Sequence, residues 1–278
     1  MKIRKRNLSE GWYPNSPDQV KKLVNTWTSS KETGKTLAGI VPHAGWSYCG
    51  RMIVRALETL SDNLNCVVVL GGHNPSGAPL VTYDDDLWEL PTGVLRRDSE
   101  LTSRVHARLP SDMKTIDEWT ADNTIEVIMP LIAAMYPRLR WAAWRVPSDE
   151  RSLAFGEILH ASASDLGLRI GVVGSTDLTH YGPDYRFMPR ESRKNPAAWV
   201  AKRDGKFLET ISTFRGVEAL KMANADHSAC SVGAALAAMA YAQEAGCIPG
   251  RILSQATSQD VHSASSFVGY GSIIWESP

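Results

Sequence analysis

Strand-like apolar runs that alternate with helical patterns constrain the fold of this chain more than any other feature. Each run is rich in β-branched or other apolar residues and is bounded by Gly or Pro, as buried strands are. The alternation predicts an α/β fold, a single layered domain in which a mostly parallel or mixed central sheet is flanked by helices. We expect strands over residues 37–41, 66–70, 141–146, 170–173 and 267–275, and helices over 17–27, 51–60, 99–108, 124–135, 152–162 and 230–242.

The chain shows no internal repeat, no low-complexity linker and no long block of charge. We therefore expect residues 1–278 to form one domain. The least regular stretch, 181–215, is rich in Arg, Lys and Pro, and we expect it to cover one edge of the domain as an irregular excursion.

Charge and apolar patterning exclude several classes of partner. The 30 basic residues balance the 30 acidic ones, so we expect no surface for nucleic acid or for an anionic membrane. The longest weakly polar run, 229–242, is shorter than the roughly 20 apolar residues of a transmembrane helix. The basic start of the chain lacks the apolar stretch of a signal peptide, and the four dispersed cysteines form no CxxC pair. These features predict a cytoplasmic protein with free thiols.

Polar loops that carry histidine follow three of the expected strands. His43 follows the first strand, His73 the second and His180 the fourth. In open α/β sheets, ligands bind beyond the carboxyl ends of the strands, so we expect these three side chains to converge. A single histidine in such a loop is as often a simple hydrogen-bonded residue as a functional one. Three together indicate a shared site, because His is the commonest side-chain metal ligand and general base.

A fourth polar element, residues 226–230, directly precedes the Ala-rich helix pattern. His227 and Cys230 are three apart, and we expect both in the first helical turn. A thiol at that place would have its pKa lowered by the helix N-terminus. A small buried cysteine with no chemical role is an equally good interpretation of Cys230.

Several of these loops belong to ordered motifs that extend nearly from end to end of the chain. They are EGWYP at 10–14, VPHAGWSYCG at 41–50, LGGH at 70–73, WELPTG at 88–93 and GSTDLTHYG at 174–182. Together they resemble the AGxWYP, APHAGYxYSG, LGPNH, WETPLG and SSDxSHYG motifs of the MEMO family. This family is also called AmmeMemoRadiSam system protein B, and it is related to the class III extradiol (LigB-type) dioxygenases.

The resemblance implies a class III extradiol dioxygenase-like fold and a metal site. The family's metal ligands map to His43, His73 and, through the register of the following helix, His227. A slip of one turn would instead place Cys230 at the family's cysteine ligand. The chain also departs from the family at Asn123, where the family has a histidine.

The leading functional hypothesis is a non-haem, metal-dependent oxygenase or dioxygenase-like enzyme. Three imidazoles suit Fe(II), which we favour, and also Zn or Cu. The expected partners are dioxygen and a small aromatic or enolic substrate. We expect His180 to act as the catalytic acid–base and Asp177 to orient it or a bound water. The expected substrate pocket is formed by Trp12, Trp46, Tyr48 and Asn123.

Two alternatives come from other functional classes. A zinc-dependent hydrolase would use the same histidines to activate water. A non-catalytic MEMO-type binding or adaptor module would use the pocket only to hold a ligand. If Cys230 is a ligand, softer metals such as Cu(I) become more favourable.

Overall fold

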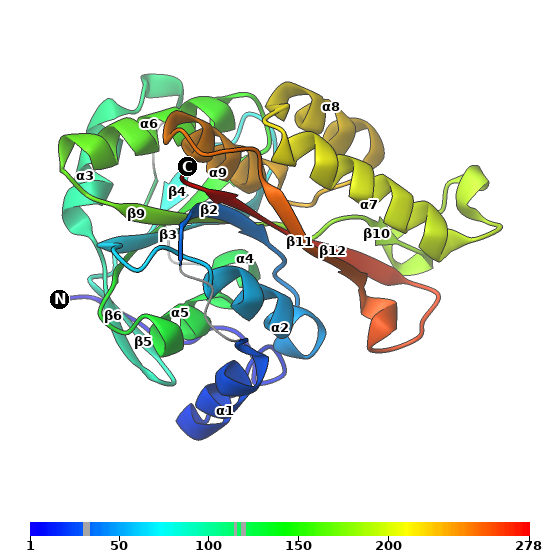
Figure 1. Cartoon of the computed structure of the whole chain (residues 1–278), viewed down its shortest axis with the longest axis horizontal. Coiled ribbons are helices and arrows are strands. Elements are labelled where there is room, and N and C mark those ends of the chain that lie inside the picture. The colour runs from blue at the N-terminus through cyan, green and yellow to red at the C-terminus, as the bar shows by residue number, and fades with distance from the viewer. Residues whose placement is uncertain (30–33, 114–115, 118–120) are drawn as a thin grey trace.

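A mixed β-sheet forms the centre of the molecule (Figure 1). The computed structural model describes residues 1–29, 34–113, 116–117 and 121–278. Within them the strand order is β10-β12-β2-β9-β3-β8-β4-β7, with β11 paired to β12. The strands are β2 (Thr36–Val41), β3 (Cys66–Asn74), β4 (Val81–Thr82), β7 (Ile116–Asp117), β8 (Arg140–Pro147), β9 (Ile170–Ser175), β10 (His180–Tyr181), β11 (Arg251–Thr257) and β12 (Phe267–Glu276).

The middle of the sheet is parallel, and an antiparallel pair flanks it on each side, β12 with β2 and β4 with β8. Strands β2, β9, β3 and β8 are parallel neighbours, whereas β12 runs antiparallel to β2. A small second sheet pairs β1 (Ile3–Arg4) with β5 (Leu87–Leu90) and β6 (Gly93–Arg96). The expected α/β class, with a mixed central sheet flanked by helices, is confirmed.

Helices cover both faces of the sheet. In Figure 1, α3, α6, α8 and α9 lie on one side, and α1, α2, α4 and α5 lie on the other. The helices are α1 (Pro17–Trp27), α2 (Trp46–Leu57), α3 (Ser99–Arg108), α4 (Asn123–Glu126), α5 (Met129–Met135), α6 (Arg151–Asp165), α7 (Pro196–Ser212), α8 (Gly216–Asp226) and α9 (Val232–Glu244).

The alternation of side chains along β3 explains why this strand reads as a continuous apolar run. Cys66, Val68 and Leu70 belong to one hydrophobic cluster, and Val67 and Val69 belong to the other. Successive strand residues point to opposite faces, and here both faces are covered by helices. Every residue of 66–70 is therefore apolar.

Glycines let α9 approach the sheet and α6 closely. A Cβ at Gly174 in β9 would lie 2.7 Å from the carbonyl oxygen of Ala234, and one at Gly156 in α6 would lie 2.4 Å from that of Ala237. Helix α9 is therefore packed between sheet and helix through small residues. This close packing fixes where the helix begins, which is close to the candidate site.

The five expected strands are present, but three helical expectations need correction. The region 124–135 is divided into α4 and α5, and Pro130 at the start of α5 favours a new helix there, because proline suits the first turn. Residues 181–215 are not irregular throughout: Asn195 caps the 17-residue α7, which has Pro196 at its first position. Helix α2 begins earlier than expected, at Trp46. Helix α8 and strand β11 were not expected at all.

None of the helices in the described residues combines the length and the apolar character that a bilayer crossing requires.

Candidate metal centre and its cavity

The carboxyl ends of three parallel strands bring the main polar side chains together. His43 lies just beyond β2, His73 lies near the end of β3, and Asp177 lies just beyond β9. Since β9 pairs with both β2 and β3, these three ends are adjacent. The end of β3 is irregular: Gly72 has a φ of 93°, and its N–H donates to Oγ1 of Thr124. The sheet therefore determines the position of each group.

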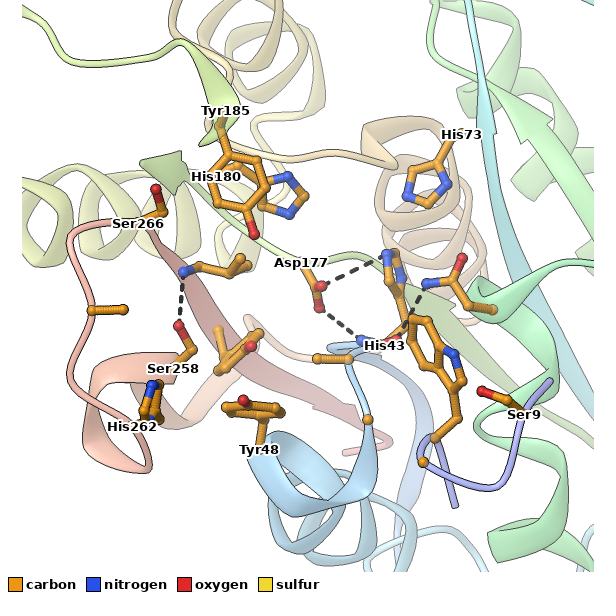
Figure 2. A pocket seen from close by; sticks show the side chains of 18 residues that line it. Ser9, His43, Tyr48, His73, Asp177, His180, Tyr185, Ser258, His262 and Ser266 are labelled. Atoms are coloured by element: carbon orange, nitrogen blue, oxygen red, sulfur yellow. Dashed lines mark hydrogen bonds and ion pairs between the residues drawn. The ribbon is translucent and has the colours of Figure 1, made fainter. Parts of the chain in front are cut away.

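His43, His73 and Cys230 form a cluster of possible metal ligands. One ligand atom from each residue lies within 4.8 Å of the other two. The Sγ atom of Cys230 is 3.3 Å from Nε2 of His43, and the His43 and His73 rings are edge to face with centroids 5.1 Å apart. Both rings are shown in Figure 2.

The loop after β9 positions Cys230. The backbone N–H of Cys230 donates to the carbonyl oxygen of Asp177 at 3.1 Å, and the N–H of Ser231 donates to Oγ1 of Thr176 at 3.0 Å. Helix α9 begins only at Val232, so Cys230 lies on the connection from α8 and not in a helical turn. These two hydrogen bonds therefore hold the connection between α8 and α9 against the loop after β9.

His43 is held from several sides and is uncharged. Its Nδ1 is 2.9 Å from Oγ of Ser175, and Nδ2 of Asn123 donates to its carbonyl oxygen. Its backbone N–H donates to Oδ1 of Asp177 at 2.7 Å (Figure 2). Burial, together with the neighbouring His73, lowers the pKa of His43 to about 3. The ring is therefore neutral near pH 7, as a metal ligand must be.

Asp177 is buried beside His43. Its Oδ2 atom lies 3.8 Å from Nε2 of His43. Burial raises the pKa of Asp177 to about 6, although the N–H of His43 opposes the shift. Asp177 thus contacts His43 directly, a contact that the sequence analysis, which expected Asp177 to orient His180 or a bound water, did not foresee.

The expectation of a low pKa for Cys230 is wrong. Burial raises the pKa of this thiol to about 12. The expected lowering required a place in the first turn of a helix, and Cys230 precedes that turn. Without a metal, this side chain is a protonated thiol near pH 7.

The structure places His227 away from the His43–His73 pair. His227 ends α8 in a left-handed conformation with a φ of 54°, is exposed, and packs edge to face against Phe187 with ring centroids 5.5 Å apart. The expected register made the Ala-rich helix begin nearer to His227. Instead α8 extends to Asp226, and Cys230 takes the position beside His43.

A cavity of about 520 Å³, which we call the large cavity, opens onto this cluster. His43, His73 and Asp177 line it, and so do Trp12, Tyr48 and Asn123 of the expected pocket. Trp46 does not: it is buried in the hydrophobic core, where its Nε1 donates to the carbonyl oxygen of Val127 at 2.8 Å. The expectation of Trp46 as a pocket residue is therefore wrong, because α2 begins at this residue and turns its ring inward.

His180 lines the large cavity on the side opposite His43 and His73 (Figure 2). Its ring packs against that of Tyr185 with centroids 4.9 Å apart. Burial lowers the pKa of His180, and the nearby Asp177 opposes this shift. Within the described residues, its buried Nε2 atom has no hydrogen-bond partner. A neutral imidazole with a free nitrogen is suited to accept a proton from a ligand.

Sequence reasoning missed several further residues of this site, and three of them are Ser175, Tyr185 and Tyr270. Ser175 binds His43, and Tyr185 and Tyr270 line the cavity. Ser175 ends β9 and belongs to the 174–182 motif that the sequence analysis had already singled out, so its place could have been found. Tyr185 and Tyr270 carry no such signal, because nothing local distinguishes a tyrosine of a cavity wall from one of the core.

Glu126 fixes the N-terminal wall of the large cavity. Its Oε1 accepts hydrogen bonds from the backbone N–H groups of Asn7 and Leu8 and from the hydroxyl of Tyr13, at 2.8–3.0 Å. The backbone N–H of Trp46 in turn donates to the carbonyl oxygen of Trp12. The cavity wall around Trp12 is therefore attached to both α4 and α2.

The fold and the site together define a class: an α/β protein with a two-histidine, one-cysteine cluster at the carboxyl ends of a central sheet. A family model described as Memo-like protein matches residues 4–274. The chain belongs to this family.

Relatives agree with this membership, and a solved structure is similar in fold. The chain is 28% identical to a MEMO1 family protein of Pyrococcus furiosus, over 98% of each chain. It is 29% identical to a MEMO1 family protein of Thermococcus onnurineus, over 98% of this chain and 99% of that protein. The crystal structure of an uncharacterized protein of Escherichia coli K12 aligns with a TM-score of 0.51 at 13% identity, covering 85% of this chain and 99% of that one. This last likeness concerns the fold alone.

Proposed function

We propose that this protein is a metal-dependent oxidoreductase of the oxygenase type that acts on a small aromatic or enolic substrate. The observation that carries the proposal is the cluster of His43, His73 and Cys230, which opens onto a cavity that also contains His180. Three donors from the protein leave coordination positions open for substrate, as a catalytic centre requires.

The residues fit a transition metal. The 3.3 Å between Sγ of Cys230 and Nε2 of His43 is close to the roughly 3.5 Å between two donors that share a tetrahedral ion. One ring is already neutral, and an ion would displace the thiol proton of Cys230. We propose iron or copper. Imidazole suits both metals, and the thiolate favours copper as Cu(I), the softer of the two. A redox-active metal held there would supply the Lewis acidity and electron transfer that oxidation of the substrate requires.

His180 is the proposed acid–base. A phenol or enol that enters the large cavity must lose its proton to become a good electron donor. The neutral ring of His180 lines the cavity with a nitrogen free in the described part of the chain, so it can accept that proton and later return it. Ser175 and Asp177 orient His43 through its Nδ1 and its backbone N–H.

The walls of the large cavity suit a planar ligand. Trp12, Tyr48, Tyr185 and Tyr270 contribute aromatic surface. Among the described residues that line it, Asp177 is the one carboxylate, and no Lys or Arg is present. A neutral ring is therefore easier to accommodate there than a phosphate.

A zinc-dependent hydrolase is the second candidate, and Cys230 favours it. Imidazole and thiolate are common zinc ligands, and a zinc ion with three protein ligands keeps an open position for water. His180 would then protonate the leaving group.

The metal retained by the protein separates these candidates. We would purify the chain anaerobically without a tag and compare the metal content of the wild type with that of His43→Ala, Cys230→Ser and the matched control His227→Ala. Near-stoichiometric iron or copper, lost in the first two variants and kept in the third, supports the proposal and is followed by oxygen uptake with catechol. Zinc with the same pattern favours the hydrolase. A wild type that holds no metal, even after reconstitution, would rule out both and leave a binding module.

A further inference from the structure

A second cavity lies next to the large cavity and has the opposite electrostatic character. It has a volume of about 370 Å³ and is formed by the segment after β10 and the connection between α8 and α9. We call it the Arg186 cavity. It is lined by Leu178, His180, Tyr185, Arg186, Phe187, His227, Ala229 and Cys230.

The two cavities meet at the candidate metal centre. His180 and Tyr185 line both of them and so form the partition between them. Cys230, the third possible ligand, lines the Arg186 cavity, whereas His43 and His73 line the large cavity. A ligand bound in the Arg186 cavity is therefore adjacent to the cluster.

Arg186 gives the cavity a positive charge that no acidic side chain of the described lining balances. The described residues that line it contribute one guanidinium and two imidazoles but no carboxylate. Within the described part of the chain, the side chain of Arg186 forms no hydrogen bond or ion pair. The nearest acidic residue of α8, Asp226, is engaged with Arg203 at 2.9 Å. Asp184, two residues before Arg186, is exposed.

Backbone strain is concentrated at the same cavity. The described residues include three non-glycine residues with positive φ, and two of these, Arg186 at 52° and His227 at 54°, line the Arg186 cavity. A left-handed conformation is unfavourable for residues with a Cβ, and such strain tends to be retained where it serves a function. Here the conformation presents a guanidinium and an imidazole to the same space.

From the free guanidinium, the absence of carboxylates in this lining and the strained backbone, we infer that the Arg186 cavity binds a carboxylate group of the substrate. One fixed positive charge matches one carboxylate, and the planar guanidinium can donate two parallel hydrogen bonds to it. The imidazoles of His180 and His227 offer further N–H donors. The inference rests on the proposed function: the substrate is then a small aromatic or enolic acid, bound by its carboxylate beside Cys230 and with its reacting part in the large cavity.

The test compares an acid with its amide. The probes are 3-(4-hydroxyphenyl)propanoate and 3-(4-hydroxyphenyl)propanamide, titrated calorimetrically into the chain at low ionic strength. The proteins are the wild type, Arg186→Gln and the control Arg193→Gln, which removes an exposed arginine outside the cavity. We expect the acid to bind the wild type and the control about tenfold more tightly than the amide. In Arg186→Gln, this preference should disappear while amide binding stays unchanged.

A further variant separates binding from structure. Arg186→Gly relieves the left-handed strain, so its unfolding midpoint should be equal to or above that of the wild type while the preference for the acid is lost. Equal affinities of the wild type for acid and amide, no binding of the acid, or an unchanged preference in Arg186→Gln would overturn the inference.

Titrations with chelator-treated protein distinguish this inference from the proposed function. A preference for the acid that persists without metal supports the carboxylate site whatever the metal analysis shows. Metal binding with no preference for the acid leaves the metal centre intact and removes the carboxylate site alone.

Discussion

The thiol of Cys230 lies 3.3 Å from Nε2 of His43, although 187 residues separate the two in the chain. The contact depends on two hydrogen bonds from the backbone of 230–231 to the loop after β9. The third donor of the cluster is thus set by a neighbouring strand end and not by the helix that follows it. The predictions below concern this contact and the packing that supports it.

Cobalt should report the thiolate directly. Co(II) bound by the wild type should give a near-ultraviolet band from thiolate-to-cobalt charge transfer, because we propose Cys230 as a donor. Cys230→Ser should lose the band and bind Co(II) at least about tenfold more weakly. His227→Ala should keep both the band and the affinity. A band that disappears in His227→Ala but not in Cys230→Ser would contradict the structure.

Removal of Glu126 should destabilise the protein strongly. Glu126→Ala leaves two backbone N–H groups and the Tyr13 hydroxyl without their acceptor, so we expect a loss of about 3–5 kcal/mol in the free energy of unfolding. Glu126→Gln keeps one acceptor oxygen and should lose less. Urea unfolding measures both, and the exposed Glu157→Gln should stay within about 0.5 kcal/mol of the wild type.

Asp204 should make stability depend on pH. Its Oδ1 accepts a 2.6 Å hydrogen bond from Thr179, but in the described residues Oδ2 is buried without a partner, close to Gly269. Burial raises the pKa of Asp204 to about 7. The folded state therefore binds this proton more tightly than the unfolded chain does. Its stabilising effect is complete below the unfolded pKa of about 4 and is lost as the pH rises to about 7.

Asp204→Asn cannot ionise, so its stability relative to the wild type should rise by about 2–3 kcal/mol between pH 5 and pH 8. Urea unfolding at both pH values measures the difference. The exposed Asp62→Asn provides the matched control and should change little between the two pH values. A constant difference between Asp204→Asn and the wild type would show that the carboxyl is already ionised in the folded protein at pH 5.

Two glycines in helix interiors should respond in opposite directions to alanine. In Gly156→Ala, the new methyl group would overlap the α9 backbone at Ala237, and we expect a loss of about 1–3 kcal/mol. In Gly205→Ala, the methyl group meets only the flexible end of Gln255, so the better helix propensity of alanine should give a gain of up to about 1 kcal/mol. Thermal unfolding of both variants tests whether α9 is as closely packed as the structure indicates.

Strands that are apolar on both faces were predictable from the sequence, because 66–70 and 170–173 have no other stable place than the middle of a covered sheet. The convergence of His43 and His73 followed from the same logic, since both lie at the carboxyl ends of parallel strands. Cys230 could not be assigned in this way. Its place depends on the length of α8 and on hydrogen bonds to Thr176 and Asp177, which are tertiary contacts without a local pattern.

The misplaced Trp46 shows the same limit. Its neighbours His43 and Tyr48 face the cavity, but α2 starts at residue 46, and the helical period of 3.6 residues places Trp46 on the buried face together with Cys49 and Gly50. The expected helix began only at residue 51, so the sequence analysis placed Trp46 in the right region but gave its side chain the wrong orientation. The motif was informative about the region and silent about the direction of each side chain.

The three residues of the cluster differ in how far each can be substituted without disturbing the rest of the fold. His43 and His73 are tied to strands whose register supports the whole sheet, whereas Cys230 lies on a connection between two helices. A single substitution at this connection can exchange a sulfur donor for an oxygen or nitrogen donor without disturbing strand pairing. The metal preference of the proposed centre can therefore evolve separately from the sheet that presents its two histidines.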